Sequence, residues 1–168
     1  VREGRFRGWE PLLLMGAEVW GKTIGIVGPG RIGKAVAHRA GGFSMKVLFA
    51  GRPRKELERV LHESDFVVLT CPLTPQTRHL IGRKELRMMK RSAILVNVAR
   101  GPVVDEKAMV DALRRGVIAG AGLDVYEEEP RIHPGLMKLP NVVLLPHLGS
   151  ATHATRARMA EIAARNLI

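Results

Sequence analysis

Residues 21–40, GKTIGIVGPGRIGKAVAHRA, join an apolar strand to an alanine-rich helix through three glycines, Gly28, Gly30 and Gly33. This Gly-x-Gly-x-x-Gly spacing is typical of dinucleotide binding. Gly28 permits the tight turn out of the strand, Gly30 lets the backbone approach a pyrophosphate, and Gly33 lets helix and strand pack closely. Backbone N–H groups at the start of the helix, from about Arg31, are expected to hold the phosphates, with the helix dipole behind them.

Outside this stretch, short apolar runs alternate with amphipathic helical segments. Strands are predicted at 23–27, 46–49, 66–69, 93–97, 119–125 and 141–145, and helices at 31–40, 56–61, 106–116 and from about 154. Such alternation is typical of a parallel sheet with helices on both faces. We therefore predict a single α/β domain with a Rossmann-type doubly wound parallel sheet. The glycines alone would be a weak indication, because glycines cluster in many strand-to-helix turns, and this context supports the dinucleotide interpretation.

The composition fits one folded domain. The 168 residues are 46% hydrophobic, which is enough for one core. No apolar run approaches the ~20 residues that a membrane span needs, and no secretory signal is visible, so we expect a cytoplasmic protein with no membrane partner. The single cysteine, Cys71, excludes an internal disulfide framework and a multi-cysteine metal site, and no metal site is predicted.

The chain is strongly basic. Its net charge is +11, from 27 Lys and Arg against 16 Asp and Glu, which would fit a nucleic-acid-binding protein. However, the basic residues are spread over many segments, and aromatic residues make up only 4%. A solvated basic surface explains the charge better, together with an anionic small molecule such as a dinucleotide phosphate. We expect no nucleic-acid partner; steeply salt-dependent DNA binding would revive that alternative.

Ligands of such a sheet bind at the carboxyl ends of its strands, so the residues that follow each strand are the candidates for a site. The second strand is followed by Gly51, Arg52, Pro53 and Arg54. A site that prefers NAD usually places an acidic side chain here, on the adenine ribose hydroxyls. Gly51 lacks that carboxylate and two arginines add positive charge, so NADP(H) is the preferred cofactor and NAD(H) is possible. The alternative is that both arginines are merely exposed turn residues.

Three later strand ends present Arg100, then Asp124 with Glu129, and then His147. Each of these residues has an ordinary structural explanation. An arginine before glycine can anchor a turn, a glutamate in EEEP can be solvated, and a single histidine is more often structural than functional. Because all of them emerge at the ligand-binding edge of one sheet, we predict that they share a site.

Along nearly its whole length the chain resembles the D-isomer-specific 2-hydroxyacid dehydrogenases. The matching segments are GKTIGIVGPGRIG, CPLTPQTRHLI, ILVNVARGPVVDE, AGAGLDVYEEEP, LPNVVLLPHLGSAT and TRARMAEIAARNL. Within that family it looks most like the glyoxylate and hydroxypyruvate reductases, where a non-acidic Gly-Arg turn after the second strand accompanies NADPH use. The resemblance implies an oxidoreductase that reduces a 2-oxo acid to a D-2-hydroxy acid by hydride transfer.

The resemblance also implies a role for each strand-end residue. Arg100 would bind the carboxylate and carbonyl of the 2-oxo acid through its two-pronged guanidinium. His147 would protonate the carbonyl oxygen, and Glu129 would orient its ring and favour its protonated form. Asp124 would hold the nicotinamide carboxamide. By position, the cofactor contacts are Gly28, Pro29, Gly30, Arg31, Ile32 and Gly33 at the pyrophosphate, Gly51, Arg52, Pro53 and Arg54 at the adenosine end, and Val98, Ala99, Arg100, Asp124, His147, Leu148 and Gly149 near the nicotinamide.

The chain departs from the family pattern in three respects. Pro29 withholds one backbone donor from the glycine loop, which we expect to be tolerated because later N–H groups make the phosphate contacts. The link from GRPRK to ELERVLHESDF is about a dozen residues short, so a strand or helix at the adenosine end is expected to be trimmed. The family's second, substrate-covering domain is not expected here: residues 1–21 resemble an interdomain and dimerisation arm, 22–150 the dinucleotide-binding domain, and 151–168 the start of a returning helix.

Two functions therefore stay open. The first is an NADP(H)-dependent reductase of glyoxylate or hydroxypyruvate. The second is a truncated, non-catalytic dinucleotide-binding and dimerisation module, because hydride transfer needs a substrate that is oriented and shielded from water. Members of the family usually dimerise through this domain and its arm, so the resemblance implies a homodimer in which Trp9 and Pro11 face the second copy.

Overall fold

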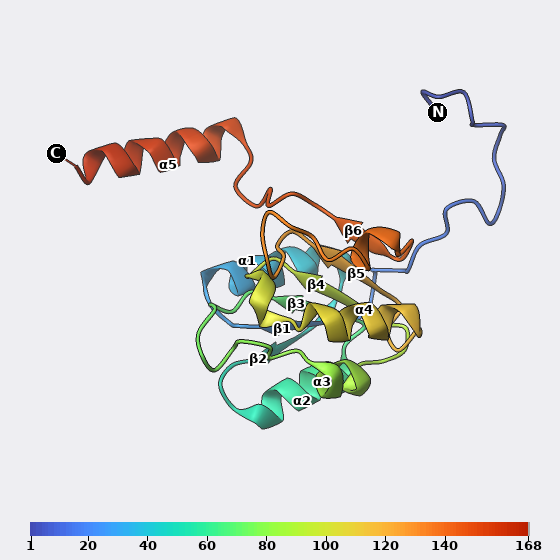
Figure 1. The fold of residues 1–168 in the computed structure, drawn as a ribbon, viewed down its shortest axis with the longest axis horizontal. Helices are drawn as coiled ribbons and strands as arrows, with labels where there is room; N and C mark the ends of the chain where they lie inside the picture. Colours follow the sequence, from blue (N-terminus) through green and yellow to red (C-terminus); the bar gives the residue numbers. More distant parts are fainter. Residues whose placement is uncertain (168) are drawn as a thin grey trace.

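The centre of the molecule is a six-stranded parallel sheet, seen in a computed structural model that describes residues 1–167 (Figure 1). The strands are β1 (Thr23–Val27), β2 (Lys46–Ala50), β3 (Phe66–Leu69), β4 (Ile94–Asn97), β5 (Gly120–Leu123) and β6 (Val142–Leu144). Their order across the sheet is β2-β1-β3-β4-β5-β6, and every neighbouring pair is parallel. The predicted α/β fold is confirmed, and each predicted strand boundary lies within two residues of the observed one.

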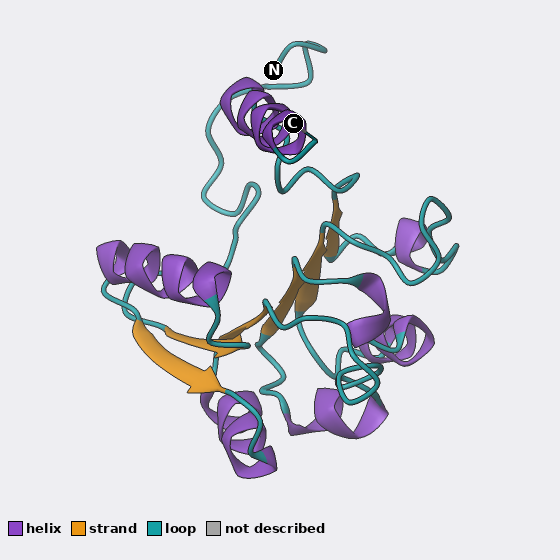
Figure 2. Ribbon diagram, turned by 90° about the vertical axis from the view of Figure 1, so that its left-hand side faces the viewer, coloured by secondary structure: helices purple, strands orange, loops and turns teal. Residues whose placement is uncertain are grey.

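Helices cover both faces of this sheet (Figure 2). Helix α1 (Arg31–Ala40) covers one face, and α2 (Arg54–Glu63), α3 (Arg83–Met88) and α4 (Glu106–Arg114) cover the other. Successive side chains of each strand point to opposite faces of the sheet. In β3, Val67 and Leu69 join the core under α2, α3 and α4, whereas Val68 packs on the side of α1. Helix α3 is an element that the sequence did not predict.

The connection between β2 and β3 is short, as the sequence predicted. Strand β2 lies at the edge of the sheet, and α2 alone carries the chain from there to β3 on the far side of β1. Helix α2 is longer at both ends than the predicted 56–61. It begins directly after its N-cap, Pro53, and ends at Glu63. Arg54, which was predicted to contact the cofactor from the turn after β2, is therefore the first residue of a helix.

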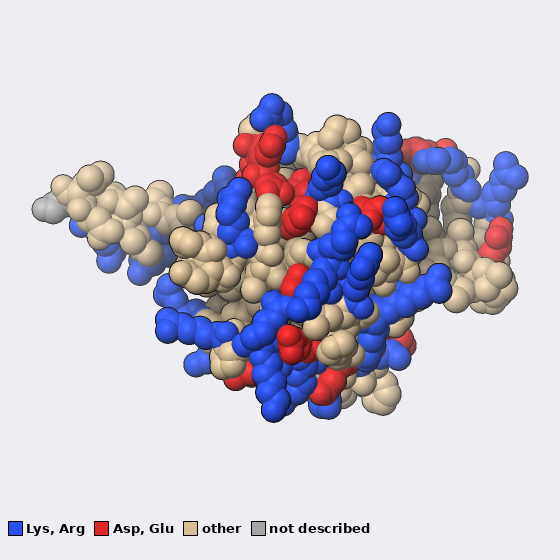
Figure 3. Space-filling view, turned by 60° about the horizontal axis from the view of Figure 1, so that its bottom comes forward, with Lys and Arg blue, Asp and Glu red and all other residues tan. Residues whose placement is uncertain are grey.

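Both ends of the described chain extend away from the sheet (Figure 1, Figure 2). Residues 1–18 are exposed throughout, and helix α5 (His153–Arg165) buries none of its residues. Among residues 1–167 no helix combines the length and the apolar character needed to cross a membrane. Basic side chains predominate on the face shown in Figure 3, with smaller patches of acidic side chains scattered among them.

Candidate dinucleotide-binding and active site

The glycine loop lies at the point where the strand order reverses, with β2 on one side of β1 and β3 on the other. Gly28 has a φ of +99°, and a Cβ atom placed on it would lie 2.6 Å from the backbone nitrogen of Cys71. A Cβ on Gly33 would lie 2.4 Å from the carbonyl oxygen of Gly28. A Cβ on Gly30 would meet nothing within 4 Å. Two of the glycines are thus required by the fold itself, and the third faces open space.

The beginning of α1 fits an anionic ligand. Gly30 is the N-cap, no side chain caps the helix, and its first turn holds no acidic residue. The first N–H groups of a helix have no acceptor within the helix and carry the positive end of its dipole. Gly30, Arg31 and Ile32 are exposed, so a pyrophosphate can reach these donors. Thr70 steadies the loop, because its hydroxyl donates to the carbonyl oxygen of Gly28 at 2.7 Å.

A buried asparagine shapes the loop that carries Arg100. Asn97 ends β4; its Oδ1 accepts the Ala99 N–H at 3.0 Å, and its Nδ2 donates to the Arg100 carbonyl at 3.0 Å. The Arg100 side chain is held from within the loop, since Nη1 donates to the Ala99 carbonyl at 2.6 Å, and the residue is exposed. A Cβ on Gly101 would lie 1.8 Å from the carbonyl of Tyr126. This loop therefore packs directly against the segment that follows β5.

His147 and Glu129 form a hydrogen-bonded pair beyond the ends of β6 and β5. Nδ1 of His147 lies 2.9 Å from Oε2 of Glu129, whose Oε1 accepts the Tyr126 N–H at 3.0 Å. The hydrogen bond from His147 is the main cause that holds the pKa of Glu129 below its ordinary value, and the nearby charge of Arg100 acts in the same direction. Because an ionised carboxylate only accepts, we assign the shared proton to Nδ1. Nε2 is then the ring nitrogen left for a substrate.

Asp124 holds the loop that contains His147. Asp124 is 7% exposed, and its carboxylate accepts two backbone N–H groups, those of Leu148 at 2.7 Å and Gly149 at 2.9 Å. His147 has a φ of +56°, in the left-handed region that non-glycine residues seldom occupy. The carboxamide contact that the family resemblance implies for Asp124 stays a prediction. In the structure its carboxylate also fixes the backbone directly after His147.

The adenosine end of the site is built around the turn after β2. Gly51 and Arg52 are exposed, and within residues 1–167 no ion pair engages Arg52. Arg54 instead pairs with two carboxylates: Nη2 lies 2.6 Å from Oε1 of Glu85, and Nε lies 3.2 Å from Oε1 of Glu58. The hydrogen bond to Glu85 is the main cause that raises the pKa of Arg54. Of the two predicted phosphate ligands, Arg52 is therefore the one whose charge is not already compensated.

The family model of the D-isomer specific 2-hydroxyacid dehydrogenase NAD binding domain matches residues 1–149. The chain belongs to this dehydrogenase family. It is 54% identical to the glyoxylate reductase of Thermococcus onnurineus (strain NA1) over 184 aligned positions, which cover all of this chain and 55% of that protein.

Solved structures agree with this assignment. The TT0316 protein from Thermus thermophilus superposes with a TM-score of 0.90 at 49% identity, over 96% of this chain and 54% of that one. An NADPH-dependent glyoxylate/hydroxypyruvate reductase from Sinorhizobium meliloti, solved with citrate, gives a TM-score of 0.87 at 35% identity, over 99% of this chain and 55% of that one. The chain thus spans about half the length of the relatives that it matches.

The dehydrogenase domain brings the predicted residues together in two groups. The glycine loop and the turn of 51–54 lie at the ends of β1 and β2. Arg100, Asp124, Glu129 and His147 lie beyond the ends of β4, β5 and β6. Further residues predicted to contact the cofactor differ in their exposure to solvent. Ile32, Val98, Leu148 and Gly149 are exposed, whereas Ala99 is buried. Pro53 is the N-cap of α2.

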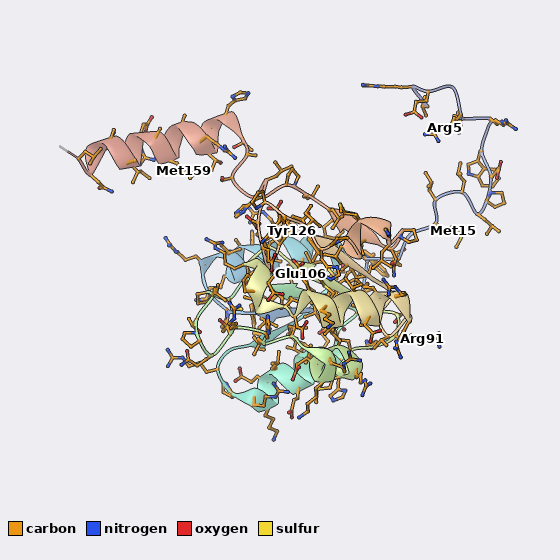
Figure 4. All side chains as sticks on the ribbon, in the orientation of Figure 1. Arg5, Met15, Arg91, Glu106, Tyr126 and Met159 are labelled. Carbon is orange, nitrogen blue, oxygen red and sulfur yellow. The ribbon has the colours of Figure 1, made fainter. Side chains whose placement is uncertain are left out.

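Three residues that hold the dehydrogenase site together escaped prediction: Thr70, Asn97 and Tyr126. The hydroxyl of Tyr126 donates to the carbonyl of Leu145 at 2.8 Å, which ties the end of β5 to the end of β6. Figure 4 labels Tyr126 and also Glu106, at the start of α4, whose Oε1 accepts the N–H of the residue after Tyr126 at 2.6 Å. Thr70, Asn97 and Tyr126 each end or closely follow a strand. Polar residues at such positions can be found from the sequence once the strands are predicted.

Proposed function

We propose that the protein containing this domain reduces a 2-oxo acid of the glyoxylate or hydroxypyruvate type to the 2-hydroxy acid, with NADP(H) as the preferred cofactor and His147 as the proton donor. The observation that carries the proposal is the His147–Glu129 pair, 2.9 Å apart, at the same sheet edge as the glycine loop. The names of the relatives, glyoxylate reductase above all, support the substrate class.

The chemistry needs a proton at one defined atom. A dinucleotide bound at the glycine loop would supply the hydride that adds to C2 of the 2-oxo acid, and the negative charge that develops on the carbonyl oxygen would then need a proton. His147 donates that proton from Nε2, and the Glu129 carboxylate, through Nδ1, keeps the ring in position and stabilises the imidazolium beforehand. In the reverse direction, neutral His147 accepts the hydroxyl proton.

Arg100 supplies the complementary charge for the substrate. Its guanidinium is exposed, and its charge acts, with the hydrogen bond from His147, to lower the pKa of Glu129. A planar guanidinium presents paired N–H groups that match a carboxylate. We propose that Arg100 binds the carboxylate of the 2-oxo acid and thereby orients its carbonyl toward His147.

The preference for NADP(H) rests on the turn after β2. Gly51 contributes no carboxylate for ribose hydroxyls, and the exposed Arg52 offers a charge for a 2′-phosphate. Arg54 takes no part in this proposal, because Glu58 and Glu85 compensate its charge.

The test uses the full-length protein and follows NADPH oxidation with glyoxylate and with hydroxypyruvate. We expect His147→Ala to lower kcat by about 10²- to 10⁴-fold, the usual contribution of a general acid, while the variant still binds NADPH. His38→Ala, on the exposed surface of α1, is the matched control and should keep normal turnover. Turnover within a few-fold of wild type in His147→Ala would refute the assignment. NADPH binding without any turnover by the wild type would favour the non-catalytic module.

We also propose that the domain forms a homodimer through its arm and α5. Trp9 is 84% and Leu14 93% exposed in the single chain, and Met159 on α5 is 54% exposed. Figure 4 shows Met15 and Met159 standing away from the body of the molecule, so the arm does not fold back on its own sheet. Apolar side chains in such extended segments indicate a protein partner. Sedimentation velocity should report a dimer that Leu14→Ser weakens and Phe43→Ser, on the body, does not; a monomeric wild type would refute this.

A further inference from the structure

We infer that Glu56 governs the choice between NADH and NADPH in this domain, an inference that rests on the proposed dinucleotide binding. Glu56 lies in the first turn of α2, and its Oε2 accepts a hydrogen bond from the backbone N–H of Gly51 at 2.8 Å. The residue that follows β2 is a glycine, yet a carboxylate is held at the end of β2.

The surroundings of Gly51 place this carboxylate beside the glycine loop. A Cβ atom on Gly51 would lie 3.4 Å from Oε2 of Glu56, 4.0 Å from Cγ of Pro29 and 4.0 Å from Cδ of Pro53. The Glu56 carboxylate therefore lies in van der Waals reach of a side chain at position 51, which would also touch Pro29, the second residue of the fingerprint. In folds of this class, that position receives the adenine ribose.

The short connection after β2 explains how Glu56 reaches this place. Pro53 has extended backbone angles and is the N-cap of α2, so only three residues separate the end of β2 from the start of the helix. Glu56 is then the third residue of the helix, from which a glutamate can reach back to an N–H group that precedes the helix. The negative charge is also favoured at this helix end by the dipole.

Glu56 and Arg52 act in opposite directions on a 2′-phosphate. With Oε2 engaged by Gly51, Oε1 of Glu56 can accept from a ribose 2′-hydroxyl, and the same charge repels a 2′-phosphate. Arg52, exposed in the same turn, attracts that phosphate. The site therefore keeps NADH as a usable cofactor beside NADPH, and the balance between these two side chains sets the preference.

The test measures binding to the chain with two probes, adenosine 2′,5′-bisphosphate and adenosine 5′-monophosphate, which differ only in the 2′-phosphate. Glu56→Gln keeps an acceptor for the Gly51 N–H and removes the charge. Calorimetric titration should show that this variant favours the bisphosphate about tenfold more than the wild type does, the size of one charge-assisted contact. Arg52→Ala should shift the ratio of the two Kd values by a similar factor in the opposite direction.

Glu63→Gln is the matched control, because it removes the same charge from the last residue of α2, where Glu63 faces Lys46 at 3.5 Å. It should leave the ratio unchanged, and Glu56→Ala should shift the ratio as Glu56→Gln does. A wild-type ratio in both Glu56 variants, with both probes bound, would overturn the inference. Failure of the wild-type chain to bind NADPH or NADH, followed by nicotinamide fluorescence, would instead overturn the proposed function.

Discussion

Asp124→Asn tests how the backbone after His147 is held in place. Both carboxylate oxygens of Asp124 accept backbone N–H groups, from Leu148 at 2.7 Å and from Gly149 at 2.9 Å. Asparagine has the same shape but only one accepting atom. Its amide NH₂ would face one of the two N–H groups, so one charge-assisted hydrogen bond is lost and a donor meets a donor.

The size of the effect follows from this geometry. Asp124 is 7% exposed, so solvent does not replace the lost acceptor. A hydrogen bond to a charged group contributes about 1.5–3 kcal/mol, which corresponds to a roughly 10- to 150-fold change in an opening equilibrium. The loop lies beyond β6 at the exposed end of the sheet, so we expect it to open locally, without unfolding of the core.

Amide hydrogen exchange measured at single residues reads this opening directly. The protection of the Leu148 and Gly149 amides should fall by the stated factor in Asp124→Asn, while amides of the central strands keep theirs. Asp105→Asn is the control, because Asp105 accepts one N–H, from Ala108 at 2.9 Å, and asparagine caps a helix equally well. Unchanged protection at both amides in Asp124→Asn would refute the positioning role of Asp124.

Three further predictions concern stability. Gly101→Ala should lower the free energy of unfolding by about 3 kcal/mol or more in urea, because its Cβ would lie 1.8 Å from the Tyr126 carbonyl; a loss under about 1 kcal/mol would contradict this close packing. Tyr126→Phe should lower the free energy of unfolding by about 1–2 kcal/mol, because the Leu145 carbonyl loses the 2.8 Å hydrogen bond from the Tyr126 hydroxyl. An unchanged melting temperature would contradict this. Burial acts to raise the pKa of Asp65, but its hydrogen bond from Lys90 at 2.8 Å helps to bring the pKa below the ordinary value. The ionised Asp65 therefore stabilises the fold above about pH 4, and this stabilisation is lost as the pH falls through the lowered pKa. The free energy of unfolding of Asp65→Asn should be below that of the wild type at neutral pH, and the two values should converge in acid. A difference between them that does not change with pH would contradict this linkage.

The fold could be predicted because its strands are short apolar runs bounded by turns and because glycines mark the first strand end. Parallel strands share one carboxyl edge, so Arg100, Asp124, Glu129 and His147 could be assigned to one region without coordinates. The contact between His147 and Glu129 followed from the family resemblance, and the structure places them within hydrogen-bonding distance.

Helix α3 escaped prediction for a physical reason. Its six residues, RKELRM, are too few to display a helical repeat of apolar positions. The partners of Arg54 were equally hidden, because Glu85 lies 31 residues further along the chain and reaches Arg54 only after α2 and α3 pack together. Local sequence therefore placed Arg54 at the cofactor, whereas the tertiary structure commits it to an ion pair.

Other site details depend on distances that no sequence pattern encodes. The reach of Glu56 back to Gly51 depends on where α2 begins, and that start was predicted two residues too late. The two N–H groups bound by Asp124 come from a loop 24 and 25 residues away. Sequence could nominate such polar residues by their place after a strand, but not the atoms that they contact.

Titration of NADPH into the wild-type chain and into Gly30→Asp shows whether the dinucleotide binds at the glycine loop. A Cβ at position 30 meets nothing within 4 Å, and aspartate is a favoured N-cap, so the variant should fold with an unchanged melting temperature. Its carboxylate would occupy the space at the start of α1 where the pyrophosphate is expected. We predict saturable binding by the wild type and a loss of affinity of about 100-fold or more in the variant. Equal affinity in the two proteins would mean that the dinucleotide does not bind at the glycine loop.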